Sequence, residues 1–577
     1  MLNFTIKKNP TTHKEYFETS IAGKHLLTTP QLNKGTAFTA EERDEFGLTG
    51  KLPMHIESLE EQVNRVYLQY TSYETPLQKN IYLNKLHDTN QVLFYKLVQN
   101  HESEMLPIIY TPTVGTAVEK FSREFQQARG LYICYEQRHQ IEKILDNRSN
   151  PEIDLMVVSD GGGVLGIGDQ GAGAMLIPVA KLMIYTIFGG INPLRTLPIL
   201  LDAGTNNAAL LNDPFYLGWR HPRIAGSDYD AFIDSFVQAI KKKFPHAVLQ
   251  WEDFGLENAR NILHRHQDQI CSFNDDIQGT GATALSALFS AIKITGIPLK
   301  DQRIVIFGGG NAGLGIADQI HRQFMQSGLC ESEARAKFWV IDKAGLLIDT
   351  ISNLTPQQQL YARKNEEVHT WQRNNITNTI DLLNVIQHIK PTALIGCSAK
   401  SGAFTKDAII AMAANVERPI IFPLSNPTEK AEAVPQDLLT WTEGKALIAT
   451  GSPFPTPLWQ GKPYPIAQCN NALVFPGIGL GAIASQATRI TDNMVSAACV
   501  ALYECAPIHQ DSNARLLPPM ENARISAREI AIAVAKQAIQ DGVATIDASN
   551  NIEACVDSHR WDAKYLPFKK VVVGSIK

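Results

Sequence analysis

The chain has 577 residues, of which 44% are apolar and 19% are charged. This length suits several domains with large buried cores, and the composition excludes an intrinsically disordered polymer. Lys and Arg number 53 against 58 Asp and Glu, and the resulting net charge of −5 excludes a polybasic nucleic-acid or membrane-surface protein. Eight scattered cysteines, without a CxxC pair or a Cys/His cluster, indicate reduced thiols in a cytoplasmic protein rather than disulfides or a zinc site.

No segment has the features of a secretion signal or a membrane span. The first residues, MLNFTIKKNPTTHKEYF, contain no apolar stretch and no small-residue cleavage site. The longest apolar stretch that we find, 471–485, is interrupted by Pro476 and is too short to cross a bilayer. We therefore expect no contact with membranes and no secretion.

The chain has two parts that differ in composition and hydrophobic pattern. Residues 1–128 have the composition of helices, and in IESLEEQVNRVYLQYTS (56–72) the apolar residues recur near the 3.6-residue period. After them, apolar β-branched runs alternate with helix-length segments, which predicts parallel strands with helices on both faces. The runs are LMVVSD (155–160), PILLDAGTNN (198–207), AVLQWED (247–253), RIVIFGGG (303–310), KFWVID (337–342), ALIG (393–396), PIIFPLSNP (419–427) and ALIATGSP (446–453).

A glycine-rich turn follows the predicted strand RIVIF. The motif GxGxxG is formed by Gly308, Gly310 and Gly313, with a helix expected to begin near Leu314. Glycines at these positions permit a tight turn and let the backbone approach a pyrophosphate at the helix N-terminus. The next strand ends in Asp342, 29 residues after Gly313, and an acid there suits a ribose diol and favours NAD over NADP. A purely structural glycine turn is the alternative.

Two acidic pairs suit a hard divalent cation. Glu252 and Asp253 end one strand, and Asp275 and Asp276 lie in FNDDIQGT. Mg²⁺ or Mn²⁺ takes two or three carboxylates from a protein and completes its shell with water and substrate. An isolated acidic pair is usually a solvated loop, but these pairs lie among apolar residues, where an unpaired charge is costly. The residues alone leave both interpretations open.

Two further side chains occupy apolar surroundings. Lys181 lies in IPVAKLMIYTIFGG, where it either extends to solvent or is desolvated, and desolvation favours the neutral amine of a general base. Tyr110 in IIYTPTVG is either a functional tyrosine or an ordinary packed aromatic residue. Asn426, Asn470 and Asn471 lie near predicted strand ends, where turn residues are common.

Together these segments closely resemble the malic enzyme family, in particular its bacterial NAD-linked branch. The resemblance covers nearly the whole chain, from KGTAFTAEERDEFGLTGKLP to the helices after Pro518. Its most specific motifs are IIYTPTVG, GIGDQG, LLDAGTNN, NDPFYLGWRHPR, WEDFG, FNDDIQGT, LSNPT, TGSPF and AQCNNALVFPGIGLG. The resemblance implies that L-malate is oxidised by NAD and decarboxylated to pyruvate and CO₂, with Mn²⁺ or Mg²⁺ as cofactor.

The resemblance also implies roles for individual residues. Tyr110 matches the family's general acid, Lys181 its general base, and Asp275 the carboxylate that orients the lysine. The metal ligands would be Glu252, Asp253 and Asp276. The cofactor would contact Gly308, Gly310, Gly313, Asp342 and Asn426, and the substrate would contact Asn426, Asn470 and Asn471.

One position departs from the family pattern. Before GIGDQG the family has Asp-Gly-Glu-Arg, whose arginine binds a malate carboxylate, but this chain has Asp-Gly-Gly-Gly and Gly163 stands at the arginine position. A glycine does not replace a bidentate guanidinium. This leaves two alternatives to the oxidative reaction, a malolactic-type decarboxylation to lactate and a catalytically impaired relative.

The resemblance implies an α/β architecture in which a Rossmann-type NAD domain is inserted into a second α/β domain, beside a helical N-terminal domain. We expect the N-terminal domain over 1–128, the catalytic domain over 129–275 and 471–540, the NAD domain over 276–470, and a C-terminal tail over 541–577. The resemblance further implies a homotetramer built as a dimer of dimers.

Overall fold

The computed structural model describes all residues except 1–3, 150–151, 165, 375–377, 548–550 and 572–577. The chain forms two compact units. The first contains residues 1–159, 170–247 and 559–577, and the second contains residues 160–169 and 248–558. The α/β class predicted from the strand runs is confirmed, while the finer four-part division stays a prediction.

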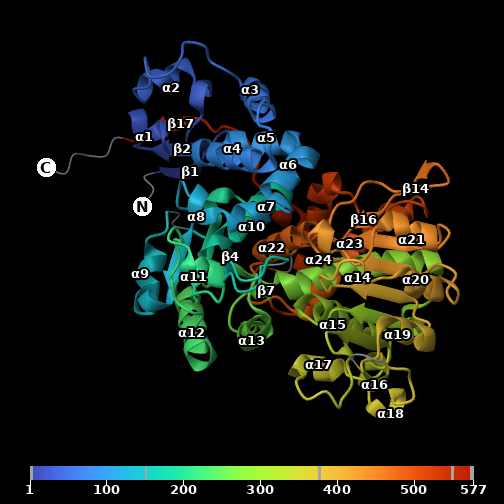
Figure 1. The fold of residues 1–577 in the computed structure, drawn as a ribbon. Helices are drawn as coiled ribbons and strands as arrows, with labels where there is room; N and C mark the ends of the chain where they lie inside the picture. The colour runs from blue at the N-terminus through green and yellow to red at the C-terminus, as the bar shows by residue number, and fades with distance from the viewer. Residues whose placement is uncertain (1–3, 150–151, 165, 375–377, 548–550, 572–577) are drawn as a thin grey trace. The chain divides into compact units, whose positions relative to one another are not determined.

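Helices dominate the N-terminal part of the first unit (Figure 1). The longer ones are α3 (Leu59–Thr71), α4 (Pro76–Thr89), α5 (Gln91–Asn100), α6 (Glu102–Ile109) and α7 (Thr113–Glu119). Capping boxes begin two of them, with Ser58 and Glu61 before α3 and Thr75 and Gln78 before α4. Such boxes satisfy backbone N–H groups that the first helical turn leaves without partners.

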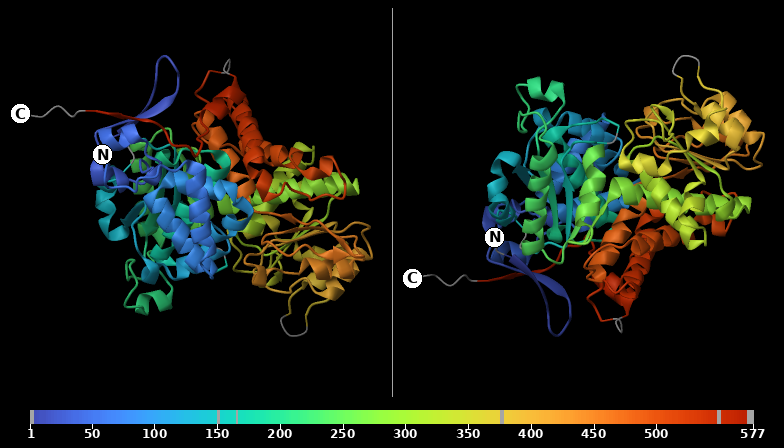
Figure 2. Two further views of the ribbon diagram at one scale, coloured as in Figure 1. Left: turned by 90° about the horizontal axis from the view of Figure 1, so that it is seen from above. Right: turned by 90° about the horizontal axis from the view of Figure 1, so that it is seen from below.

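The two ends of the chain meet in a small sheet that the sequence did not predict. Strands β1 (Phe4–Lys8) and β2 (Glu15–Thr19) are antiparallel, and β17 (Phe568–Lys570) joins β2 in parallel. Both views of Figure 2 show the C-terminal segment beside the N-terminal strands. The Phe568 ring stacks on Phe17 and Phe38 at centroid distances of 5.6 and 5.8 Å. Strand β17 therefore completes an apolar cluster of the first unit.

Parallel strands follow the helices of the first unit, as predicted. Strands β3 (Leu131–Cys134), β5 (Thr196–Asp202) and β4 (Leu155–Ser159) lie side by side in that order. Helix α10 (Leu176–Ile184) packs on β4 and β5 and continues into a π-helical turn at Tyr185–Gly189. The stretch Gly171–Gly189 is longer than 471–485, so our choice of the longest apolar stretch was wrong, but it is 94% buried, as in a core helix.

The second unit begins with a strand pair that carries the acidic motifs. Strands β6 (Val248–Glu252) and β7 (Ser272–Asn274) are parallel, and helix α13 (Leu256–His266) connects them. Helices α22 (Phe475–Ala484), α23 (Asp492–Glu504) and α24 (Ala523–Gln540) pack together in the same unit. In the described part of the chain, no disulfide joins the eight cysteines.

A seven-stranded sheet within the described residues confirms the Rossmann-type domain. Its strand order is β10-β9-β8-β11-β12-β13-β16, and all neighbours are parallel except β10 and β9. The strands are β8 (Ile304–Phe307), β9 (Phe338–Asp342), β10 (Gly345–Leu346), β11 (Ala393–Gly396), β12 (Ile420–Pro423), β13 (Leu447–Thr450) and β16 (Ala467–Gln468). Helix α15 (Asn311–Gln326) follows β8, as the glycine motif predicted. Because β8 lies where the strand order reverses, its carboxyl end is the expected ligand position.

A partly buried histidine is expected to make the stability of the first unit sensitive to acid. His87 lies on α4 against the rings of Phe94 and Tyr95, and burial lowers its pKa to about 4. An unfolded histidine has a pKa of about 6.5, so between these values the unfolded chain binds more protons than the folded chain. The stabilisation is complete above about pH 6.5 and is lost as the pH falls toward 4, with a loss of about 2 kcal/mol expected at pH 5.

The measurement is the thermal unfolding midpoint of the native chain and of His87→Gln at pH 7.5 and pH 5. Because glutamine does not titrate, we expect the variant to lose less stability on acidification. An equal loss in both proteins would show that His87 does not carry this acid sensitivity.

Candidate active site

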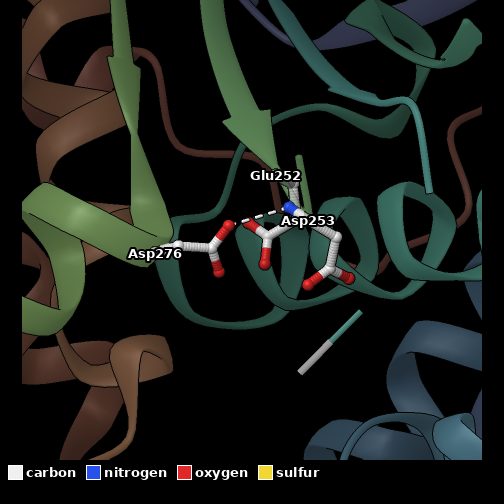
Figure 3. A group of neighbouring side chains, drawn as sticks. All are labelled: Glu252, Asp253 and Asp276. Atoms are coloured by element: carbon white, nitrogen blue, oxygen red, sulfur yellow. Dashed lines mark hydrogen bonds between the residues drawn. The ribbon is translucent and has the colours of Figure 1, made fainter. Parts of the chain in front are cut away.

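Three buried carboxylates gather where β6 and β7 end (Figure 3). Glu252 is the last residue of β6, Asp253 follows it, and Asp276 is the second residue of the π-helical turn (Asp275–Gly279) after β7. Carboxylate oxygens of the three lie within 4.8 Å of one another, and the residues are only 3%, 3% and 4% exposed. The predicted metal ligands are thus brought together by the fold.

The backbone at Asp253 explains how consecutive residues reach one place. Side chains in a strand alternate between the two faces of the sheet, so Glu252 and Asp253 would point apart if β6 continued. Asp253 instead has a φ of 55°, a left-handed conformation that aspartate tolerates better than most residues. Its backbone N–H donates to Oδ2 of Asp276 at 2.8 Å, which ties the ends of both strands together.

The donor set fits a hard divalent cation. Three mutually close, buried carboxylates repel one another and are tolerated when a cation lies among them. Carboxylate oxygen is the ligand that Mg²⁺ and Mn²⁺ prefer, and three protein ligands leave positions for water and substrate. Behind them, the fully buried Gln250 donates from Nε2 to Oε2 of Glu252 at 2.6 Å and so orients this carboxylate.

The glycine-rich loop of the second unit packs against the metal-ligand loop. The N–H of Gly163 donates to the carbonyl of Asp253 at 3.0 Å, and the N–H of Gly162 donates to Oδ1 of Asp160 at 2.8 Å. A Cβ on Gly163 would lie 2.9 Å from the carbonyl oxygen of Phe254, closer than real Cβ atoms approach. A side chain at position 163 therefore requires this loop or the loop of Phe254 to move.

Asp275 and Asn471 form one hydrogen-bonded group. Nδ2 of Asn471 donates to Oδ2 of Asp275 at 3.1 Å, to its carbonyl at 3.2 Å and to Oγ1 of Thr280 at 3.0 Å. A Cβ on Gly279 would lie 1.9 Å from Oδ1 of Asp275, so only glycine fits there. Asn470 caps the following turn, since its Oδ1 accepts the N–H of Ala472 at 2.9 Å. The sequence did not reveal that Asn471 supports Asp275.

Lys181 and Tyr110 are neighbours within the first unit. Lys181 lies on α10 and is 3% exposed, which excludes the alternative in which its side chain extends into solvent. Tyr110 follows α6 and is 6% exposed. Nζ of Lys181 lies 5.4 Å from the centroid of the Tyr110 ring, within the range of a cation–π contact. An amine and a phenol, both able to carry a proton, are therefore placed side by side.

The glycine turn after β8 packs tightly on its neighbours and is open at Gly310. Gly308 has a φ of 119°, and a Cβ there would lie 2.5 Å from the carbonyl of Cys397. A Cβ on Gly313 would lie 1.9 Å from the carbonyl of Gly308, so the first turn of α15 packs directly on the loop. At Gly310 a Cβ would meet nothing within 4 Å, so this glycine borders open space. The turn thus leaves its backbone accessible at the N-terminus of a helix.

Asp342 ends β9, the strand beside β8, as predicted. Nε2 of Gln358 donates to its Oδ2 at 3.0 Å and to the carbonyl of Gly309 at 3.1 Å, which joins the acid to the glycine turn. Sequence reasoning missed Gln358, whose only local signal is a capping box with Thr355.

On the other side of β8, Asn426 follows β12, and its Oδ1 accepts the hydroxyl of Ser452 at 2.5 Å. The Nδ2 group of Asn426 is thereby oriented as a donor.

Comparison with known proteins covers nearly the whole chain. The family model "Malic enzyme, N-terminal domain" matches residues 87–267, and "Malic enzyme, NAD binding domain" matches residues 277–539. The NAD-dependent malic enzyme of Salmonella agona is 48% identical over 552 residues, which are 96% of this chain and 97% of that protein. The NAD-dependent malic enzyme of Salmonella typhimurium gives the same identity and coverage.

Solved structures support the same assignment at the level of the fold. Entamoeba histolytica malic enzyme matches with a TM-score of 0.53 and 24% identity, covering 89% of this chain and 90% of that one. Malic enzyme from Pyrococcus horikoshii matches with a TM-score of 0.52 and 22% identity, covering 79% and 88%. With 48% identity to full-length relatives and two family models that together span most of its residues, this chain belongs to the malic enzyme family.

Proposed function

We propose that this chain catalyses the oxidative decarboxylation of L-malate to pyruvate and CO₂, with reduction of NAD and a requirement for Mn²⁺ or Mg²⁺. The observation that carries the proposal is the buried group Glu252, Asp253 and Asp276 in the same unit as a Rossmann-type sheet. The names of the 48% identical relatives support NAD and malate as the reactants.

Each bound group would supply one kind of chemistry. The divalent cation, held by Glu252, Asp253 and Asp276, supplies Lewis acidity toward the C2 oxygen of malate. NAD, held at the Gly308–Gly313 turn with Asp342 at the ribose, supplies the hydride acceptor. Asn426 and Asn471 would orient substrate and cofactor through their amide groups, and the Asp275–Asn471 bonds keep this part of the second unit rigid.

Lys181 and Tyr110 would move the protons. Lys181 would accept the C2 hydroxyl proton as malate is oxidised, since its buried amine is a base that lies beside Tyr110. After CO₂ leaves, Tyr110 would donate a proton to C3 of the enol of pyruvate. Their contact within the first unit would let the amine return a proton to the phenol after turnover.

Oligomeric state and location belong to the same proposal. A homotetramer built as a dimer of dimers follows from the family resemblance, as does L-malate as the small-molecule substrate. A cytoplasmic location follows from the scattered cysteines, none of which forms a disulfide in the described residues.

The metal site can be tested by stability. We expect Mn²⁺ to raise the thermal unfolding midpoint of the native chain, because binding to the folded state alone stabilises it. Glu252→Gln and Asp276→Asn should lose this increase, since each removes a charged ligand. Glu257→Gln, which changes an exposed residue five positions after Glu252, is the matched control and should keep it. An undiminished metal-induced shift in both ligand variants would overturn the assignment.

The proton-transfer roles can be separated by partial reactions. Lys181→Met should lower malate oxidation by about 10²–10⁴-fold, the usual contribution of a general base. Tyr110→Phe should slow protonation of the enol of pyruvate by a similar factor. The phenylalanine ring keeps the burial and the ring contacts of Tyr110. Lys143→Met, at an exposed lysine of the first unit, should change neither rate. If Tyr110→Phe slows only hydride transfer, the assignment of Tyr110 to C3 is wrong.

The products formed from L-malate distinguish the oxidative reaction from the two alternatives that Gly163 raises. On addition of L-malate, NAD and Mn²⁺, we expect the native chain to form NADH and pyruvate. Lactate without net NADH would instead identify malolactic chemistry, and no product despite NAD binding would identify an impaired relative.

We also expect Gly163→Ala and Gly163→Arg to raise the KM for malate by about tenfold or more, because a Cβ would press on the carbonyl of Phe254 beside the metal ligands. Gly255→Ala is the control, since a Cβ there meets nothing within 4 Å. A gain of activity in Gly163→Arg would show that the loop adapts and that the missing guanidinium limits the native chain.

A further inference from the structure

Glu432 is a fully buried carboxylate with a dense set of donors. It follows β12 by nine residues and is 0% exposed. Its Oε1 accepts the N–H of Ser398 at 2.8 Å, the hydroxyl of Ser398 at 2.8 Å and the hydroxyl of Ser425 at 2.5 Å. Its Oε2 accepts the N–H of Ser425 at 3.3 Å. These four donors suit a carboxylate, which only accepts hydrogen bonds, and the NH₂ group of a glutamine would find no acceptor among them.

The two serines extend the network to the backbone around them. Oγ of Ser398 accepts the N–H of Lys400 at 3.1 Å, and Oγ of Ser425 accepts the N–H of Ala399 at 2.8 Å. Ala399 has a φ of 54°, a conformation that alanine adopts only when its surroundings enforce it. The carboxylate of Glu432 therefore connects the turn after β11 with the turn after β12.

Both turns belong to the edge of the sheet where the dinucleotide turn lies. Strand β11 lies between β8 and β12. A Cβ on Gly308 would lie 2.5 Å from the carbonyl of Cys397 and 2.9 Å from the N–H nitrogen of Ser398, so the turn after β11 packs on the glycine turn. On the other side, Ser425 precedes Asn426 directly. The side chain of Glu432 packs so closely on β11 that a Cβ on Gly396 would lie 2.6 Å from Cδ of Glu432.

We infer that Glu432 is a positioning residue of the NAD site. It acts through Ser398 and Ser425 to hold the turn that supports Gly308 and the turn that presents Asn426, and it does not touch the cofactor. This inference rests on the proposed binding of NAD at the carboxyl ends of these strands, but it does not depend on which acid is oxidised.

Glu432→Gln probes this role with almost no change in volume. Because Oε1 accepts three bonds and Oε2 one, the glutamine oxygen would occupy the Oε1 position and its NH₂ group would face the N–H of Ser425. Two donors cannot satisfy each other, and a buried N–H without an acceptor is costly. The backbone at 425 and 426 would shift, while the bonds of Ser398 would be kept.

Thr392→Val is the matched control. Thr392 precedes β11 at the opposite end of the same strand and is 3% exposed. Its hydroxyl donates to Oε1 of Gln302 at 2.6 Å and accepts the N–H of Arg303 at 2.9 Å. Valine is isosteric and breaks both bonds, so the variant loses buried hydrogen bonds of the same sheet away from the proposed cofactor edge.

The experiment is calorimetric titration of NAD into the native chain and both variants without malate or metal, with thermal unfolding of each unliganded protein beside it. We expect Glu432→Gln to weaken NAD binding by about tenfold, and Thr392→Val to lower the unfolding midpoint while its Kd for NAD stays within twofold of the native value. In turnover, Glu432→Gln should raise the KM for NAD more than it lowers kcat. Ser425→Ala removes only one hydroxyl and should weaken NAD binding less than Glu432→Gln does. It replaces Glu432→Gln in the test if that variant does not fold.

Equal weakening of NAD binding in Glu432→Gln and Thr392→Val would overturn the inference, because stability alone would then explain the result. Native affinity in both Glu432→Gln and Ser425→Ala would overturn it as well. If the native chain binds NAD but forms no NADH from malate, the proposed reaction fails while the binding comparison still decides the role of Glu432. If the native chain does not bind NAD, both fail.

Discussion

The concentration of negative charge at the ends of β6 and β7 is the constraint on which the candidate site depends. Glu252, Asp253 and Asp276 hold carboxylate oxygens within 4.8 Å of one another in a region excluded from water. Such a group is stable in a fold only when positive charge and hydrogen bonds compensate it. The surrounding backbone is adapted to this demand, because the left-handed turn at Asp253 aims two consecutive side chains at one place and its N–H is used to hold Asp276.

At the Rossmann-type sheet, single carboxylates are held by neutral hydrogen-bond donors. Parallel strands bring their carboxyl ends to one edge, where polar residues of several turns meet. Here the turns are joined by single side chains that reach between them, with Gln358 between the glycine turn and Asp342, and Glu432 between Ser398 and Ser425. A cofactor edge assembled from separate loops gains a defined shape from such cross-connections, because a polar group buried there keeps its position only while its partners keep theirs.

Local patterns predicted many of the strands and the glycine turn because these depend on neighbouring residues, whereas the roles of the site residues were implied by the family resemblance. The apolar runs ending in Glu252 and Asp342 predicted strand ends, and the glycine spacing around Gly310 predicted the turn before α15. The pairing of β17 with β2 was missed, because its partners are more than 500 residues apart and neither strand shows alternation strong enough to suggest the other. Gln358 and Glu432 were missed for the same reason, since each is an ordinary polar residue until the fold brings it to Asp342 or Ser425.

Gly163 shows how a change of side chain and a change of packing are coupled. Compared with the arginine of the family pattern, glycine removes a guanidinium, but it also lets the loop donate its own N–H to the carbonyl of Asp253 at 3.0 Å. With the backbone in this position, a Cβ at position 163 would lie 2.9 Å from the carbonyl oxygen of Phe254, so a side chain there requires one of the two loops to move. A cation still reaches this loop, since Nζ of Lys430 donates to the carbonyl of Gly166 at 2.6 Å. The loop of this chain therefore lacks the charge of the family arginine but contacts Asp253 through its backbone. We expect the affinity for malate to depend on how firmly Asp253 is held as well as on the lost charge.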